Sequence, residues 1–318
     1  MLCSALAHAW QMGPVADTAA SLDRRAMVLG WRQMAHDGSA GYSHVVEDMA
    51  RAHPDDVRRL FRSGELDGVT SGLCLGYLQA NLAVLPVEAA GEFREFCGAN
   101  QRIMPLIDVT GPGDPAPRRV APMADLRTDL PRYRVYLRGQ LAGEPRDVRD
   151  LWRDDLVAFL LGCSFTVELK LLEAGVRLRH RELGQNVPMF ITSLQCAPVG
   201  RFRGPVVVSM RPIAHDRVEV ARRVTADYPL AHGAPLHVGD PRAIGIQDVH
   251  IPDFGDPIEV LPDEVPVFWA CGVTPQAVIM AVRPDFAITH APGHMFITDV
   301  KDSEVRGRQP LVVAATGA

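Results

Sequence analysis

Two segments of the sequence bring a carboxyl group and a guanidinium into apolar surroundings, where either can take part in chemistry. Cys163, Ser164 and Glu168 share an apolar stretch, and burial there would raise the pKa of Glu168 towards that of a general acid or base. Ser209 and Arg211 end an apolar strand, from which a guanidinium can hold a carboxylate through two hydrogen bonds. The structural alternatives are an exposed Glu168, a Cys163 that is simply buried, and a salt bridge at Arg211.

A second group of candidates lies in segments that glycine and proline hold in irregular conformations. His237 and Asp240 stand in one of them, where an imidazole can serve as base, acid or ligand unless it simply faces solvent. His290 and His294 are spaced like a helical metal-binding pair, but Pro292-Gly293 prevents the helix that would put both rings on one face. Metal ligation, substrate contact and a structural role therefore stay open for these two histidines.

The segment 268–276 predicts a buried strand that turns sharply at Gly272, followed by a helix that starts at Pro275. In open α/β sheets this end of a strand borders the ligand crevice. Asp299, after the next short strand, is placed to orient one of the histidine rings. Because sites form where several strands end, we expect four segments to converge in one cleft: 209–212, 237–240, 271–276 and 290–294.

Several common catalytic motifs are missing from the sequence. Residues 111–116 fit GxGxxA, but three prolines between 112 and 117 prevent the helix that a dinucleotide pyrophosphate needs. The patterns GxxxxGK[ST], HExxH and GxSxG do not occur. The sequence therefore argues against ATP-driven chemistry, zincin-type hydrolysis and a serine-hydrolase mechanism, and we expect no cofactor, with a divalent metal left open.

The composition is that of a globular protein that works in the cytoplasm. The 318 residues carry a net charge of −5, with 47% apolar and 22% charged residues, which argues against disorder and against a nucleic-acid partner. The N-terminus lacks the basic region of a secretory signal, and the longest apolar run has 12 residues, whereas a membrane span needs about 20. The six cysteines form no CxxC pair, so we expect all of them to be reduced.

Periodicity predicts a mixed α/β fold, in which a large mixed sheet is flanked by helices. Its strongest expected helix covers about 155–174, opened by Asp154-Asp155 and closed by Gly175. Further helices are expected at 22–36, 44–62 (interrupted at Pro54), 87–97 and 216–226. Strands are expected at 103–109, 133–137, 189–194, 205–210, 236–238, 258–261, 265–271, 287–289 and 295–299.

The chain resembles the bacterial "putative hydro-lyase" family, which is related to the D-glutamate cyclase of animal mitochondria. The resemblance covers most of residues 62–299. It rests on GYLQANLAVLP (76–86), ADLRTDLPRYRVY (124–136), WRDDLVAFLLGCSFTVE (152–168), NVPMF (186–190), VVVSMRP (206–212), HGAPLHVGDP (232–241), PVFWACGVTPQ (266–276) and ITHAPGHMFITD (288–299).

The resemblance implies a family domain at 51–318, with a smaller α+β portion at about 120–200. Residues 1–50 lie largely outside the resemblance, and their pattern predicts a helical extension. It implies loss of water from a small amino or hydroxy acid, for which conversion of D-glutamate to 5-oxo-D-proline is the example. The sequence departs from the family pattern at Phe190, where the pattern has Tyr, and at Ser193, where it has Asn. It also departs at Gln101 and Met104.

We therefore expect a cofactor-independent lyase in which Arg211 binds a carboxylate and a histidine moves a proton, while amides near Gly272 stabilise the oxyanion. Two alternatives are a carboxylate-binding protein without activity and a racemase that uses two thiols. A small carboxylate is the expected partner, and a homo-oligomer stays open. The candidate catalytic residues are His237, His290, Glu168, Asp240 and Cys271. The candidate substrate-binding residues are Arg211, Ser209, Cys163, Ser164, Gly272, Thr274, Gln276 and His294.

Overall fold

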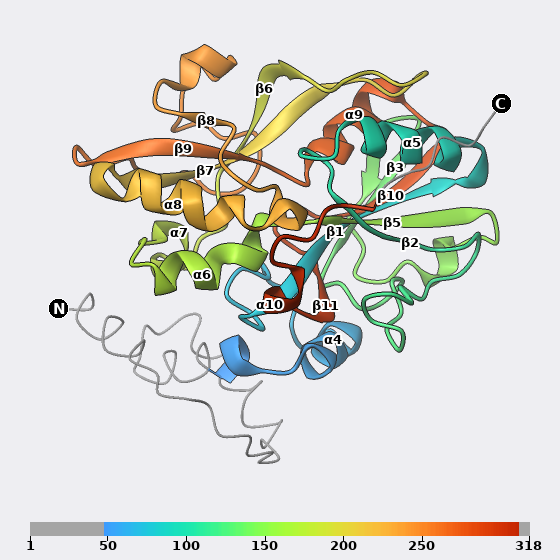
Figure 1. Cartoon of the computed structure of the whole chain (residues 1–318). Helices are drawn as coiled ribbons and strands as arrows, with labels where there is room; N and C mark the ends of the chain where they lie inside the picture. Colours follow the sequence, from blue (N-terminus) through green and yellow to red (C-terminus); the bar gives the residue numbers. More distant parts are fainter. Residues whose placement is uncertain (1–47, 312–318) are drawn as a thin grey trace. The chain divides into compact units, whose positions relative to one another are not determined.

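The computed structural model of the chain describes residues 48–311, which form two β-sheets with helices packed around them (Figure 1). The helix expected at 22–36, and nearly all of the extension 1–50, lie outside these residues. The larger sheet has the strand order β2-β5-β1-β10-β3-β4, with β11 also paired with β1, and the smaller one has the order β6-β7-β9-β8. The strands are β1 (Tyr77–Pro86), β2 (Leu106–Val109), β3 (Tyr133–Leu137), β4 (Gln140–Gly143), β5 (Leu156–Gly162), β6 (Met189–Gln195), β7 (Pro205–Ala214), β8 (His237–Val238), β9 (Glu264–Ala270), β10 (Phe286–His290) and β11 (Phe296–Lys301).

The expected α/β class is confirmed, although every pairing between these strands is antiparallel, so the large sheet is not mixed in strand direction. None of the helices within residues 48–311 has the length and apolarity to cross a membrane. The α-helices are α4 (Pro54–Ser63), α5 (Val87–Ala99), α6 (Glu168–Glu173), α7 (Arg179–Glu182), α8 (Val218–Ala226), α9 (Thr274–Val282) and α10 (Asp302–Val305). The 3-10 helices are η1 (Arg149–Leu151), η2 (Ser164–Val167), η3 (His215–Arg217), η4 (Pro229–Ala231) and η5 (Pro241–Ile244).

The prediction of a long helix at 155–174 is wrong. Residues Leu156–Gly162 form β5, which is buried along its whole length between β2 and β1. A strand buried on both faces is apolar at every position, and its sequence cannot be told from that of a buried helix. Gly162 is the last residue of the strand, and the position requires glycine because a Cβ there would lie 1.5 Å from the backbone oxygen of Leu230. The chain becomes helical only at η2 and α6, and the strand expected at 258–261 is also absent.

Strand β1, which the sequence reading missed, is the centre of the large sheet. It pairs with β5 along most of its length, while its other edge pairs first with β11 and then with β10. Between these two neighbours, the imidazole Nδ1 of His290 lies 3.2 Å from both the backbone nitrogen and the backbone oxygen of Leu82. The chain therefore leaves this edge of the sheet after His290 and returns to it at Phe296, and the turn 291–295 projects from the gap.

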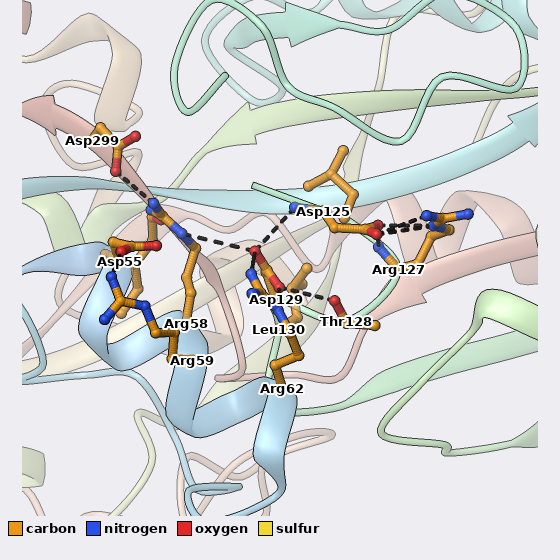
Figure 2. Close-up of polar contacts among 12 residues, drawn as sticks. Asp55, Arg58, Arg59, Arg62, Asp125, Arg127, Thr128, Asp129, Leu130 and Asp299 are labelled. Atoms are coloured by element: carbon orange, nitrogen blue, oxygen red, sulfur yellow. Dashed lines mark hydrogen bonds and ion pairs between the residues drawn. The ribbon is translucent and has the colours of Figure 1, made fainter. Parts of the chain in front are cut away.

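Helix α4 is held against the large sheet by a buried carboxylate. Asp129 is fully buried and accepts hydrogen bonds from Arg62 Nε at 2.9 Å and Nη2 at 2.7 Å (Figure 2). One turn earlier, Arg58 donates to the Ile297 carbonyl and to Asp299, both at 2.7 Å. Asp299 thus pairs with an arginine of α4, and the expectation that it orients a histidine ring is wrong.

Replacement of Asp129 by Asn is expected to lower the free energy of unfolding by about 1–3 kcal/mol, because a buried hydrogen-bonded charge is lost. Arg58, which also lies beside Asp129, keeps its partners Ile297 and Asp299 in this variant. Urea unfolding measures the change. The matched control is Asp55→Asn on the same helix, whose partner Arg59 is 46% exposed, so its expected cost is at most about 1 kcal/mol. Equal losses in the two variants would contradict this role for Asp129.

Candidate functional site

Glu168 is the centre of a buried polar cluster between α6 and β7. Its Oε1 accepts from Arg211 Nη2 at 2.9 Å and lies 2.8 Å from His180 Nε2, while Oε2 accepts from the Ser71 hydroxyl at 2.8 Å. Burial alone would raise the pKa of Glu168, but His180, through its charge when it is protonated in acid and through its hydrogen bond, and the charge of Arg211 lower it to about 2. Burial also lowers the pKa of His180, so at neutral pH an ionised carboxylate pairs with Arg211 and accepts from a neutral imidazole.

Several predicted residues gather around Arg211. Its Nη1 lies 3.3 Å from Ser209 Oγ and its Nη2 lies 3.2 Å from Ser164 Oγ. The guanidinium is 2% exposed and its charge is balanced by Glu168, so it makes the salt bridge that was the structural alternative to a carboxylate clamp. Cys163 and Cys271 lie in the adjoining apolar cluster.

The two thiols of this cluster are poor nucleophiles. Burial raises the pKa of Cys271 to about 11 and raises that of Cys163 further. Both groups are therefore protonated at neutral pH, and thiolate chemistry of the two-thiol racemase kind is disfavoured. Within residues 48–311, all five cysteines are free thiols.

The turn 291–295 lies beside this cluster because Thr70 and Ser71 contact both. Ser71 donates to Glu168, while the hydroxyl of Thr70 donates to the Gly293 carbonyl at 3.2 Å and accepts from the Met295 amide at 3.1 Å. The residue between these two peptide groups is His294. Its side chain is partly exposed, in contrast to the buried residues on either side of it.

The tautomer of His294 is determined by its only hydrogen-bond partner among the described residues. Its Nδ1 lies 3.0 Å from the Pro292 carbonyl oxygen. A carbonyl only accepts, so Nδ1 carries the proton and Nε2 keeps its lone pair. Burial lowers the pKa of His294, and the charge of Arg132 lowers it further. At neutral pH this ring is an unprotonated base.

His294 lines an open cavity of about 420 Å³ that also contains two arginines. Arg134, on β3, donates to Glu144 at 2.6 Å and to the Gln276 amide oxygen at 3.3 Å, and its guanidinium carbon lies 5.7 Å from the centre of the Phe254 ring. The cavity thus combines cations that can hold a carboxylate with a neutral base. Its lining residues are Arg132, Arg134, Glu144, Asp253, Phe254, Gly255, Ala291, Pro292 and His294.

His290 and Gln276 lie behind this cavity. His290 is fully buried, and its Nε2 has no hydrogen-bond partner within the part of the chain that the structure describes. Burial lowers the pKa of His290 to about 4, so the ring is neutral at ordinary pH. Gln276 donates to the His290 carbonyl at 2.8 Å, which orients its amide oxygen towards Arg134.

Thr274 and Gly272 hold the end of β9 in place. The hydroxyl of Thr274 donates to the Cys271 carbonyl at 2.8 Å and accepts from the Val207 amide at 3.0 Å. A Cβ at Gly272 would lie 1.9 Å from the side chain of Asn81, so a larger residue has no room there. The contacts of both residues are with the protein backbone and core.

His237 and Asp240 lie away from Arg211. His237 pairs with Phe268 on β9, and its ring centre is 5.7 Å from that of Phe268, whereas Arg211 pairs with the next residue, Val267. Because successive side chains of a strand point to opposite faces, His237 and Arg211 lie on opposite faces of the smaller sheet. Segments 271–276 and 290–294 meet through the hydrogen bond from Gln276 to the His290 carbonyl, whereas 209–212 belongs to the Glu168 cluster and 237–240 lies apart. Of the four segments only 290–294 lines the cavity, so the prediction of one shared cleft is wrong.

Comparison with known proteins supports the resemblance. A family model described as D-glutamate cyclase matches residues 157–299. A "putative hydro-lyase" of Bacillus licheniformis is 54% identical over 79% of this chain and 96% of its own length, and one of Thermoanaerobacter sp. is 57% identical over 78% and 94%. The chain belongs to this hydro-lyase and D-glutamate cyclase family. A solved structure of a nitrogen repressor-like protein from Methanococcus jannaschii aligns with 74% of this chain and 91% of its own, at 10% identity and a TM-score of 0.34. A score this low does not establish a shared fold.

Apart from His294, the sequence analysis missed the residues that line the cavity or hold its turn. Arg132 and Arg134 flank a buried tyrosine, and charged residues on alternate positions beside an apolar strand were a usable signal. Thr70, Ser71 and His180 carry no such pattern.

Within residues 48–311, no three His, Cys, Asp or Glu side chains are grouped to hold a metal ion. Phe190, where the family pattern has Tyr, packs near Phe268 on the face away from Arg211.

Proposed function

We propose that the protein is a cofactor-independent lyase that removes water from a small amino or hydroxy carboxylate, with D-glutamate as the first candidate substrate. The observation that carries this proposal is a neutral histidine of fixed tautomer, His294, in a cavity that contains Arg132 and Arg134. Membership in the hydro-lyase family supports the reaction class.

In this proposal Arg134 binds a carboxylate of the substrate. It is preoriented by Gln276 and stacks on Phe254, and its partner Glu144 is exposed enough to give way. Guanidinium groups bind carboxylates through two parallel hydrogen bonds. Arg132, which lines the same cavity and donates to Asp67 at 3.2 Å, supplies a second guanidinium.

His294 transfers the protons. With D-glutamate, Nε2 takes a proton from the ammonium group, and the amine nitrogen attacks the distal carboxyl carbon. A C–N bond forms and a C–O bond breaks, and the leaving oxygen departs as water with the two protons that the nitrogen gives up. With a hydroxy acid, the same base takes the proton from the carbon next to the carboxylate, and a C=C bond forms as the C–O bond of the neighbouring hydroxyl breaks. The departing oxygen takes up the abstracted proton from His294 and leaves as water. Both reactions need a base that is unprotonated at the start.

The reaction rate is expected to fall as the solution becomes acidic. A base works only when unprotonated, and the pKa of His294 is lowered from the ordinary value of 6.5. Burial and the charge of Arg132 lower the pKa, whereas the hydrogen bond to the Pro292 carbonyl and the charges of Asp67 and Glu144 raise it. The acidic limb of the kcat/KM profile for the free enzyme should therefore have its midpoint below pH 6.5, and a midpoint above that value would contradict the assignment.

The test is incubation with D-glutamate, with 5-oxo-D-proline measured by chiral chromatography alongside a panel of hydroxy acids. Arg134→Ala is expected to raise KM by about 10- to 100-fold with a smaller change in kcat, because a carboxylate clamp acts in the ground state and the transition state alike. Arg118→Ala, at a 72% exposed position, is the control. Binding of these acids without any product would instead support a carboxylate-binding protein.

A further inference from the structure

We infer that Thr70 is a positioning residue for His294, which acts by holding the two peptide groups on either side of it. The inference rests on the proposed function for its kinetic consequence, but its geometry is independent of the substrate. Thr70 lies more than two hundred residues before His294 in the sequence and touches neither the imidazole nor the cavity.

The contacts of Thr70 are specific to the turn. Its hydroxyl donates to the Gly293 carbonyl at 3.2 Å and accepts from the Met295 amide at 3.1 Å, and its own amide donates to the same Gly293 carbonyl at 2.8 Å. Three hydrogen bonds from one residue therefore fix the backbone before and after His294. Thr70 is fully buried, so water cannot replace these bonds.

Asn186 holds the same turn from the other side. Its side-chain nitrogen donates to the Pro292 carbonyl at 3.2 Å, the oxygen that also accepts from His294 Nδ1. A Cβ at Gly293, where φ is +85°, would lie 2.4 Å from this amide, so the turn can approach Asn186 only with glycine at that position. The carbonyl that determines the tautomer of His294 is thereby fixed in direction.

Thr70 is itself anchored by the buried ion cluster. The next residue, Ser71, donates to Glu168 at 2.8 Å, and a Cβ at Gly72 would lie 3.1 Å from the Arg181 guanidinium. This arrangement gives Glu168 and Arg211 a structural role without substrate contact. They fix the segment Thr70-Ser71, which in turn fixes the turn 291–295.

The experiment compares Thr70→Val, Thr70→Ser and Thr298→Val. Thr298 is the matched control, because it is also fully buried and its hydroxyl also donates to a backbone carbonyl, Leu78 at 2.8 Å, and accepts from an amide, Val300 at 3.2 Å. The first readout is the tautomer and titration of His294 by ¹⁵N NMR, assigned with a His294 variant. The second is kcat and KM for whichever acid is turned over.

We expect Thr70→Val to lower kcat by between about 10- and 100-fold at nearly constant KM, the usual effect of a small displacement of a reacting group. It should also weaken the Nδ1-protonated tautomer and move the titration midpoint of His294 further below 6.5, because the hydrogen bond to the Pro292 carbonyl raises that pKa. Thr70→Ser should restore both properties, and Thr298→Val should change neither. If the two valine variants behave alike, Thr70 is merely structural. If no acid is turned over by the wild-type protein, the proposed function fails, while the NMR comparison still decides the role of Thr70.

Discussion

Replacement of His294 by Asn is expected to lower the turnover of D-glutamate by about 10²–10⁴-fold, the usual contribution of a positioned proton-transfer group. Asn is the informative substitution because its amide nitrogen can replace Nδ1 as the donor to the Pro292 carbonyl, whereas nothing replaces Nε2. The turn is therefore kept and the base is removed. The loss should appear in kcat, and the acidic limb of the pH profile should disappear with it.

The control for this variant is His237→Asn. The ring of His237 is also held through one nitrogen, with Nε2 2.7 Å from the Asp240 carbonyl oxygen, but it lies on the opposite face of the smaller sheet from Arg211. Steady-state kinetics of both variants, normalised to folded protein, make the comparison. A large loss of kcat in the His237 variant, with little change in the His294 variant, would transfer the proton-transfer role to His237.

Replacement of Glu168 by Gln is expected to lower the free energy of unfolding by about 3–5 kcal/mol, because it leaves the buried guanidinium of Arg211 without a counter-charge. Glu168 is fully buried and Arg211 is 2% exposed, so solvent cannot compensate. Guanidinium-induced unfolding measures the effect. Glu173→Gln on the same helix, whose carboxylate is 54% exposed beside Lys170, should cost at most about 1 kcal/mol.

The pH dependence of stability gives a second measure of the same residue. The pKa of Glu168 in the folded protein is about 2, below the ordinary value of 4.5. A lowered pKa stabilises the fold above the ordinary value, and this contribution is lost as the pH falls from about 4.5 towards 2. The wild-type protein should therefore lose more stability over this window than the Glu168→Gln variant does, and parallel curves would contradict the ionised state assigned to Glu168.

The sequence predicted the elements that have a distinctive apolar periodicity or are bounded by glycine and proline. Helix α5 shows apolar residues at helical spacing, and α9 starts where Gly272 and Pro275 require a turn and a helix. Strand β5 was mistaken for a helix because both of its faces are buried, and β1 was missed although it is buried at nine of its ten positions. Central strands show no alternation, so their assignment depends on neighbours that come from elsewhere in the chain.

The candidate site could likewise be predicted only in part from the sequence. Ser164, Ser209, Arg211 and Glu168 do meet, although Ser209 and Arg211 lie within β7 and not at the end of a strand. The partners His180 and Ser71 could not be predicted, since His180 lies on the short helix α7 and Ser71 in a turn, and the position of both depends on the whole fold. Burial was expected to raise the pKa of Glu168, and the ion pair that reverses this shift was not visible in the sequence.

The gap in the edge of β1 sets the order in which the site can assemble during folding. Ala83 pairs with Thr289 and Ala80 with Phe296, contacts that join parts of the chain more than two hundred residues apart. Closing such long loops is slow, and during synthesis β1 can pair with β10 and β11 only after most of the chain has been made. The β1–β5 pairing can form first, whereas the turn that carries His294 exists only after both flanking strands have docked. Catalytic competence should therefore be the last property to appear on refolding, after most of the secondary structure has returned.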